Sequence, residues 1–298
     1  MPQKECLNLL ITGGTGFVGQ ALVNRLGDLP LRVPTRADSK RWDQLLVGIS
    51  TVVHLAARVH VMNDSEADPL LAFRSVNVDA TLNLARQAAS LGVKRFVFIS
   101  SVKVSGESTK FGRAFTELDT PNPQDAYGQS KYEAEQGLRQ LSFETGMEVV
   151  IIRPPLVYGP GVKANFAALI NAVHRGWPLP LGAVYNKRSL VALDNLVDFI
   201  ITCITHSQAA NQTFLVSDGQ DLSTTELVRG MAQAADVPAR LLPVPVWALK
   251  AGASLLGKGD AVQRLCGNLQ VDISKARSLL GWVPPVSVLE GLRRAMVV

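Results

Sequence analysis

The chain has 298 residues, of which 47% are hydrophobic and 18% are charged, and this is enough apolar material for a sizeable core. It has no apolar run of about 18 residues and no apolar leader near its start, which excludes membrane insertion and favours a cytoplasmic protein. The net charge of +5 comes from scattered Lys and Arg residues, a pattern that excludes a nucleic-acid surface and favours a small anionic ligand.

The first predicted element is a strand over residues 7–12, because this apolar run does not alternate, as is typical of a strand buried on both faces. Residues 20–26 then carry apolar side chains at helical spacing. The turn between them holds Gly13, Gly14, Gly16 and Gly19. Two registers of a dinucleotide motif are open, one starting at Gly13 and one at Gly14. Either register predicts close approach of a pyrophosphate to a helix start, and the alternative is a glycine turn without a ligand.

A second strand is predicted over residues 31–35, and its end bears on the choice of cofactor. NAD-binding folds tend to place Asp or Glu there to bind the ribose 2′-OH, whereas Arg accommodates the 2′-phosphate of NADP. This chain has Thr35 and Arg36, with no acid until Asp38. The sequence therefore favours NADP(H), while NAD(H) stays possible because Arg36 can instead stack on the adenine.

The following segments alternate between strand and helix patterns. Further strands are predicted over residues 51–55, 95–100, 148–152 and 213–216, with helices around 70–91 and 130–145. This alternation predicts an α/β fold with a doubly wound parallel sheet. Pro-rich segments loosen the pattern from Pro160 onward. We therefore expect a dinucleotide-binding domain over residues 1–160 and a smaller, mainly substrate-binding domain over 161–298, with later strands near 188–218 returning to the sheet.

His54 and the three cysteines are candidates for catalytic, metal or disulfide chemistry. His54 lies inside an apolar strand and is expected to be a core histidine. Cys6, Cys203 and Cys266 are isolated and show no metal-site spacing. They are expected to be small core residues, and the sequence predicts neither a disulfide framework nor a metal site.

Tyr127 and Lys131 lie four residues apart near the start of a predicted helix, so they share one helix face. A phenol is a weak base with an ordinary pKa of about 10, but a neighbouring ammonium and a positively charged nicotinamide favour the phenolate. Beside a dinucleotide, this pair predicts a proton-transfer group next to a hydride carrier. The alternative is an exposed helix pair without chemistry.

Six motifs occur in order along the chain: LLITGGTGFVG, VVHLAA, SVNVDATLNLA, FISSVKVSG, YGQSK and IIRPPLVYGPG. Together they resemble the extended short-chain dehydrogenase/reductases, and within these the UDP-glucose 4-epimerase-like nucleotide-sugar enzymes. The likeness implies a Rossmann fold with a smaller C-terminal substrate-binding domain. FISSVKVSGE and RSLVALDNLVD are similar to the bacterial O-antigen branch of UDP-sugar epimerases and 4-keto-sugar reductases.

The resemblance implies catalytic roles by position. Ser101 falls where that family keeps its catalytic Ser or Thr, with Ser100 as the nearby alternative; either can also be an ordinary hydroxyl at a strand end. Tyr127 would exchange a proton with the C4 oxygen of the sugar. Lys131 would bind the nicotinamide ribose and lower the pKa of Tyr127.

The resemblance also implies two sets of binding residues. The cofactor set is Gly13, Gly16, Phe17, Val18, Gly19, Arg36, Leu55, Ala56, Ala57, Ser100, Tyr127, Lys131, Pro154 and Val157. The substrate set is Ser101, Lys103, Asn165 and Arg188. A guanidinium fork matches two oxygens of a nucleotide diphosphate, which suits Arg188. The alternatives are a solvated loop charge for Arg188 and a surface lysine for Lys103.

The expected reaction depends on the preference for NADP(H) and on one departure from the family pattern. Relatives often carry Asn shortly after the position of Arg153, whereas here Pro155, Leu156 and Val157 follow. With an exchangeable NADPH, this favours reduction of a UDP-4-keto-6-deoxy-N-acetylhexosamine. The alternatives are 4-epimerisation of UDP-glucose or UDP-N-acetylglucosamine, and a non-catalytic dinucleotide-binding module.

The resemblance further implies a homodimer. In relatives, two helices pack across a two-fold axis into a four-helix bundle, and here these helices correspond to Val78–Leu91 and Ser130–Phe143. Their apolar positions alone do not decide the matter, because the same stripe can face the sheet.

Overall fold

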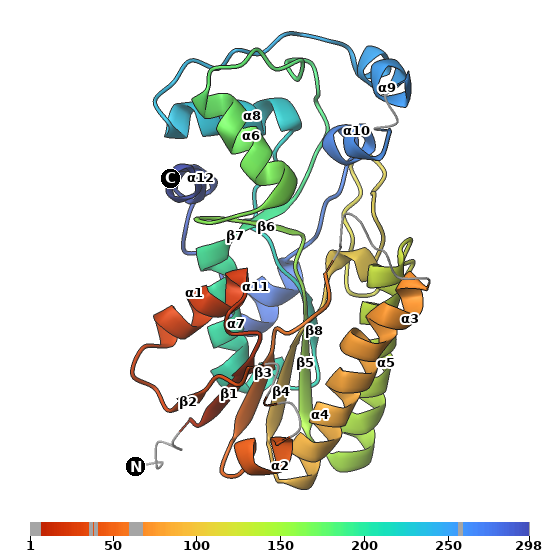
Figure 1. Cartoon of the computed structure of the whole chain (residues 1–298), viewed down its shortest axis with the longest axis vertical. Helices are drawn as coiled ribbons and strands as arrows, with labels where there is room; N and C mark the ends of the chain where they lie inside the picture. The colour runs from red at the N-terminus through yellow and green to blue at the C-terminus, as the bar shows by residue number, and fades with distance from the viewer. Residues whose placement is uncertain (1–6, 36–37, 39–40, 60–67, 256–258, 298) are drawn as a thin grey trace.

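One parallel sheet organises the molecule. The computed structural model describes all residues except 1–6, 36–37, 39–40, 60–67, 256–258 and 298. In the described part of the chain, six parallel strands pair in the order β2-β1-β3-β4-β5-β8 (Figure 1). Their bounds are β1 Leu9–Thr12, β2 Leu31–Arg32, β3 Thr51–His54, β4 Arg95–Ile99, β5 Glu148–Arg153 and β8 Thr213–Leu215. The strand order changes direction between β1 and β3, and ligands of doubly wound folds bind at such a switch point.

The predicted α/β fold is confirmed, but β2 is much shorter than the strand expected there. Every residue of β1 is buried, as its apolar run without alternation predicts, and every residue of β3 is buried as well. The strand expected over residues 31–35 contains only Leu31 and Arg32, because β2 is the edge strand and only these residues pair with β1.

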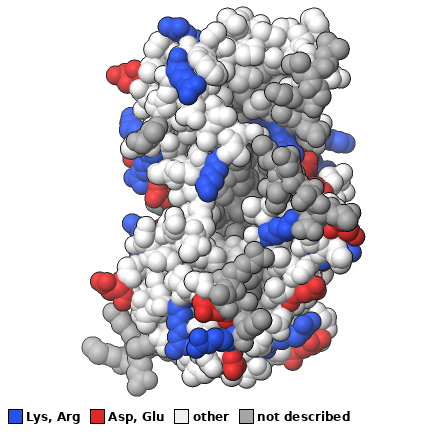
Figure 2. Space-filling view, viewed as in Figure 1, with Lys and Arg blue, Asp and Glu red and all other residues white. Residues whose placement is uncertain are grey.

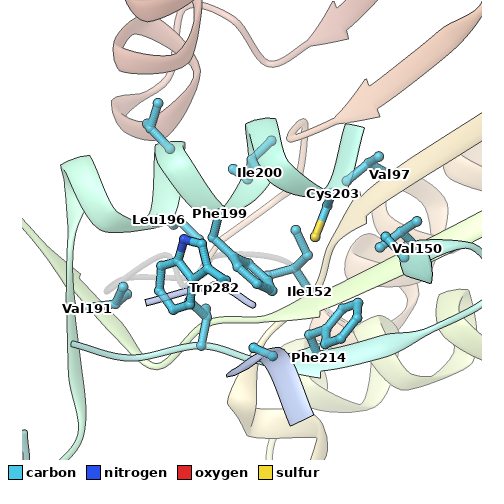
Figure 3. Packing of buried hydrophobic residues seen from close by; sticks show 14 of the residues in the cluster. Val97, Val150, Ile152, Val191, Leu196, Phe199, Ile200, Cys203, Phe214 and Trp282 are labelled. Atoms are coloured by element: carbon cyan, nitrogen blue, oxygen red, sulfur yellow. The ribbon is translucent and has the colours of Figure 1, made fainter. Parts of the chain in front are cut away.

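One face of the sheet is covered by α1 (Phe17–Leu26), α7 (Leu193–Thr205) and α11 (Ser274–Leu280). The core beneath them is mainly aliphatic, with aromatic rings packed among the aliphatic side chains (Figure 3). The ring of Phe199 lies 4.7 Å from that of Trp282 and 5.5 Å from that of Phe214, both in edge-on contact. Cys203 is fully buried in this core, whereas Cys6 lies outside the described residues.

The other face is covered by α2 (Trp42–Leu45), α4 (Ala80–Ser90) and α5 (Ala126–Thr145). The helix expected over residues 70–91 consists of α3 (Pro69–Arg74) and α4, joined by the π-helical turn η2 (Ser75–Asp79). Asp125 caps α5 by accepting a hydrogen bond from the Gly128 N–H at 2.7 Å. Gly146 ends the helix with a φ of 74°.

A smaller region with its own hydrophobic core lies beyond the carboxyl ends of the strands, at the top of Figure 1, and we call it the upper region. Its base is a two-stranded parallel sheet of β6 (Leu156–Tyr158) and β7 (Leu190–Ala192), whereas β8 pairs with β5 in the main sheet. Its helices are α6 Ala164–His174, α8 Thr224–Ala234, α9 Val246–Leu255, α10 Gly259–Cys266 and α12 Val288–Met296. None of the helices that the structure describes is long and apolar enough to cross a membrane.

Candidate active site

The glycine turn after β1 lies directly against the end of β3. Gly13 has a φ of +71°, and a Cβ at this position would lie 2.6 Å from the backbone N of Ala56. A Cβ on Gly19 would lie 2.1 Å from the carbonyl O of Gly13, so only glycine lets α1 approach the turn. Gly14 instead faces Val33, whose Cγ1 would lie 2.3 Å from an added Cβ. The backbone thus fits the register that starts at Gly13, and Gly14 has a separate packing role.

The start of α1 has the features of a phosphate site. Gly16 precedes the helix, its N–H donates to the Gly13 carbonyl at 2.9 Å, and none of the described side chains caps the helix start. The N–H groups of the first helical turn, which begins with Phe17 and Val18, therefore have no side-chain acceptor among the described residues. Free N–H groups at a helix start suit the pyrophosphate of a dinucleotide. The residues present fit such a cofactor.

Asn77 fixes the loop that follows β3, a role the sequence did not reveal. Its side chain lies in the π-turn η2, accepts from the Arg58 N–H at 2.8 Å and donates to the Arg58 carbonyl at 3.1 Å. It also donates to Ser130 of α5 at 2.9 Å. The loop of Leu55, Ala56 and Ala57, which was predicted to line the cofactor, is thereby tied to α5. Single π-turns inside helices are frequent at functional sites.

Ser101 and Tyr127 meet at the carboxyl end of β4. The Ser101 hydroxyl lies close enough to the Tyr127 phenol to lower the pKa of that phenol. Ser101 also caps the short helical turn η3 (Val102–Val104), accepting from the Lys103 N–H at 3.2 Å. Tyr127 is half-buried and its ring lies edge-on to Phe73 at 6.1 Å. Burial and the nearby Asp125 carboxylate raise the pKa of Tyr127 to about 12, and the Ser101 hydroxyl opposes this rise.

Lys131 lies one turn further along α5 and is only 2% exposed. Its ammonium lies 4.2 Å from the centroid of the Phe98 ring, a cation–π contact. Burial lowers the pKa of Lys131 to about 7, and the Glu135 carboxylate acts in the opposite direction.

His54 is a core histidine, as its apolar strand predicts. It is hydrogen-bonded to the hydroxyls of Thr12 at 2.7 Å and Thr81 at 2.9 Å. Burial and, to a lesser degree, the charge of Lys131 lower the pKa of His54 to about 3, so the ring is neutral.

Ser100 takes part in a buried ionic network that the sequence analysis missed. Its hydroxyl donates to the Glu135 carboxylate at 2.5 Å, and Glu135 is fully buried. Arg153 donates to both oxygens of this carboxylate, at 2.9 and 2.6 Å, and Arg139 adds a bond at 3.0 Å. Glu135 follows Lys131 by four residues on the same helix face, and this spacing was the available signal.

Lys103 is held by the protein's own carboxylates. Its ammonium donates to Glu107 at 2.9 Å and to Asp125, the residue that caps α5. A Cβ on Gly128 would lie 2.9 Å from the Lys103 carbonyl, so the backbone of η3 packs directly on the start of α5. This contact holds Ser101 beside Tyr127.

The other predicted site residues come from several separate segments of the chain. Asn165 is exposed in the first turn of α6, and Arg188 is half-buried in the upper region, where it donates to the Gly267 carbonyl at 3.1 Å. Burial lowers the pKa of the Arg188 guanidinium. The Pro154 carbonyl accepts from the Val102 N–H at 3.0 Å. Val157 is in β6, and Arg36 lies outside the described residues.

Comparison with known proteins identifies relatives along almost the whole chain. The NAD dependent epimerase/dehydratase family matches residues 9–217. A UDP-glucose 4-epimerase of Vibrio cholerae is 50% identical, over 98% of this chain and 95% of that protein. The structure of a UDP-glucose 4-epimerase from Thermotoga maritima with UDP-glucose is similar, with a TM-score of 0.75 and 24% identity over 97% of both chains. A UDP-glucuronic acid 4-epimerase from Bacillus cereus in complex with NAD gives a TM-score of 0.75 at 20% identity, over 97% of both chains.

The expectation of a 4-keto-sugar reductase is wrong, because the relative that is 50% identical over nearly the full chain is a 4-epimerase. That expectation depended on Arg36, which lies outside the described residues, and on the missing polar residue after Arg153. The structure explains the latter, since Leu156 and Val157 form β6 and pair with Leu190 and Val191 of β7. Apolar residues at these positions reflect sheet formation and do not report on the reaction.

Proposed function

This chain belongs to the NAD-dependent epimerase/dehydratase family, and we propose that it interconverts UDP-glucose and its C4 epimer. It is an enzyme of that family rather than a non-catalytic dinucleotide-binding module. One observation carries the proposal: α5 presents Tyr127 against Ser101, with Lys131 one turn further, in a chain that is 50% identical to a UDP-glucose 4-epimerase.

Tyr127 is the proposed acid and base for the C4 oxygen of the sugar. The nicotinamide cofactor, when bound, accepts a hydride from C4 and returns it. Ser101 hydrogen-bonds the reacting oxygen and keeps it within reach of the Tyr127 hydroxyl. Tyr127 removes the proton of the C4 hydroxyl during oxidation and returns one during reduction. The configuration at C4 inverts if the 4-keto sugar rotates in the site between oxidation and reduction. The same phenol then serves both steps.

The charges around Tyr127 differ from those expected from the sequence. A Lys131 ammonium was expected to bring the Tyr127 pKa towards neutral, but burial and Asp125 raise that pKa to about 12. With a pKa of about 7, Lys131 itself carries only part of a charge at neutral pH. We therefore assign the larger part of Tyr127 activation to the positive nicotinamide ring, and to Lys131 the binding of the nicotinamide ribose.

We propose NAD(H) rather than NADP(H) as the resident cofactor. An epimerase oxidises and re-reduces the same sugar, so its cofactor is regenerated in every turnover and has no need to leave. Gly13, Gly16 and Gly19 would let the pyrophosphate approach the backbone at the start of α1. Leu55, Ala56 and Ala57 would line the dinucleotide at the end of β3.

Asn165 and Arg188 are proposed to hold the nucleotide diphosphate. Both belong to the upper region, so the substrate would bridge this region and the carboxyl ends of the main strands. The desolvated Arg188 guanidinium would interact strongly with phosphate oxygens, because water screens it less than an exposed charge.

We also propose a homodimer through α4 and α5. These helices pack tightly on each other, since a Cβ on Gly137 of α5 would lie 2.6 Å from the Leu82 side chain of α4. Phe143 of α5 is 87% exposed, and a second copy would cover this ring. A monomeric mass by light scattering at micromolar concentration would reject the dimer.

The proposed reaction is tested by incubating the purified protein with UDP-glucose and no added cofactor, while proton NMR follows the anomeric signals. We expect UDP-galactose to accumulate to a constant ratio with no net change in nicotinamide absorbance. Net consumption of added NADPH without formation of the epimer would overturn the proposal.

Tyr127→Phe tests the assigned base. Loss of one acid/base group removes about 10²–10⁴ in rate, so we expect kcat to fall by this factor while the content of bound dinucleotide stays the same. Tyr132→Phe, on the same helix, is the matched control and should retain its activity. A Tyr127→Phe variant with unchanged kcat would remove Tyr127 from the mechanism.

A further inference from the structure

Two adjacent segments of the upper region expose large apolar side chains at one end of the molecule. Residues 175–185 and 237–255 run side by side over the top of Figure 1, and we name them together the apolar ridge. Backbone bonds join them, from the Leu179 N–H to the Arg240 carbonyl at 2.8 Å and from the Gly182 N–H to the Leu242 carbonyl at 2.9 Å. The ridge ends in α9, which packs chiefly on α10.

The exposed apolar residues of the ridge are amphipathic aromatics and one leucine. Trp247 is 74% exposed, Tyr185 68%, Trp177 55% and Leu242 49%. The chain has four tryptophans, and the other two, Trp42 and Trp282, are buried in the core. Exposed apolar side chains that gather in one patch mark an interaction site, whereas scattered ones need no explanation.

The charges of the ridge have one sign. Residues 175–185 and 237–255 contain Arg175, Arg240 and Lys250, all exposed, and no Asp or Glu. The neighbouring helix α8 contributes Glu226, which is paired with Lys187 at 3.6 Å, and Asp236 follows its end. In Figure 2, the part of this end that is not grey is white with blue Lys and Arg atoms and with red at its left margin, whereas both colours mix over the lower part.

We propose that the apolar ridge binds the surface of a bilayer that contains anionic phospholipid. Tryptophan and tyrosine favour the headgroup level of a membrane, where one part of the ring is dry and the polar atom stays wet. Lys and Arg beside them are attracted to anionic headgroups. The binding is peripheral, since no described helix can cross a membrane. This surface is separate from the Ser101–Tyr127 site, and the proposal does not depend on the epimerase reaction.

The test is co-sedimentation of the purified full chain with vesicles in a buffer without sugar nucleotide. One set of vesicles is pure phosphatidylcholine, and the other is an equimolar mixture of phosphatidylcholine and phosphatidylglycerol. We expect the protein to sediment with the mixed vesicles, to remain in solution with the neutral ones, and to be released by added salt. Equal binding to both sets, or binding to neither, would overturn the proposal.

Matched substitutions locate the contact. Trp247→Ser and Lys250→Glu should each weaken binding to mixed vesicles by at least about fivefold. Their controls are Val47→Ser, at a residue 58% exposed, and Arg25→Glu, in the last turn of α1, and both should bind like the unchanged protein. If the controls weaken binding equally, the contact lies elsewhere. If Trp247→Ser instead lowers the mass measured by light scattering, the ridge covers a second copy of the chain and the lipid proposal fails.

Discussion

Two of the ion pairs that connect α5, the helix of Tyr127 and Lys131, to other parts of the molecule differ in their access to water. In the inner pair, Glu135 and Arg153 are 2.6 Å apart and their side chains are 0% and 3% exposed. In the outer pair, the Lys103 and Asp125 side chains are each 28% exposed. The inner pair joins α5 to β5, and the outer pair joins the start of α5 to η3.

The difference in exposure predicts different roles. A buried pair is essential once it is built, because removing one member leaves the other charged and dry. A half-exposed pair contributes little to stability, because water screens it. The outer pair instead affects the pKa of Tyr127, because Asp125 raises that pKa and Lys103 lies against the Asp125 carboxylate. The inner pair therefore stabilises the fold of the site, while the outer pair adjusts its chemistry.

Glu135→Ala should have the largest effect on stability. It leaves the Arg153 guanidinium buried without its carboxylate, and losing one member of a buried pair lowers the free energy of unfolding by about 3–5 kcal/mol. Urea denaturation of the purified variant measures this change.

The control for Glu135→Ala is Arg139→Ala, because Arg139 bonds the same carboxylate from a position that is 38% exposed. Its loss should lower the free energy of unfolding by less than about 1 kcal/mol. Equal losses in the two variants would contradict the distinction between the inner pair and the more exposed contact.

The sequence was sufficient where local pattern alone determines structure. The apolar run of β1, which does not alternate, predicted a strand buried on both faces, and the glycine spacing predicted a turn against a helix start. The spacing of Tyr127 and Lys131 predicted a shared helix face, and α5 contains both. These features depend on residues that are close in sequence, so their periodicity can be read directly.

The sequence was insufficient where distant segments meet. Lys103 meets Asp125 at the start of α5, and Asn77 meets Arg58 and Ser130. These contacts join segments 19 or more residues apart, and only the tertiary fold creates them. The predicted reaction was also wrong, because the apolar residues of β6 were interpreted as the loss of a polar substrate contact. Their pairing with β7 is a tertiary feature without a local signal.

Gly128→Ala tests the packing of η3 on the start of α5, where the outer pair lies. The new Cβ would lie 2.9 Å from the Lys103 carbonyl, so η3 has to shift away from α5. Overpacking of this kind lowers the free energy of unfolding by about 1–3 kcal/mol, and we expect kcat to fall because Ser101 moves with η3. Gly252→Ala is the control, since nothing lies within 4 Å of a Cβ at that helical position. A stable and fully active Gly128→Ala variant would show that η3 accommodates the methyl group.

His54 provides a buried group that stays neutral, in contrast to the inner ion pair. Its pKa is about 3 in the fold against an ordinary 6.5, so the unfolded chain binds a proton first as the pH falls. Between these two values the folded state loses about 1.4 kcal/mol of stability per pH unit. Urea denaturation from about pH 7 to about pH 5 should show this additional slope in the unchanged protein and not in His54→Gln. Parallel pH curves would mean that the ring takes up its proton inside the fold.

Lys103→Met should have the smallest effect on stability and the most specific effect on catalysis. The pair is half-exposed, so the free energy of unfolding should change by less than about 1 kcal/mol. Without the ammonium, the negative charge of Asp125 acts on Tyr127 with less opposition and raises its pKa further. A base with a higher pKa is deprotonated at higher pH, so the rising limb of the kcat profile should move to higher pH.

Arg113→Met, which breaks the Arg113–Asp119 pair at 2.7 Å, should leave the profile unchanged. A substrate contact by Lys103 would instead raise KM and leave the pH profile in place, and this outcome would return Lys103 to the substrate site expected from the sequence.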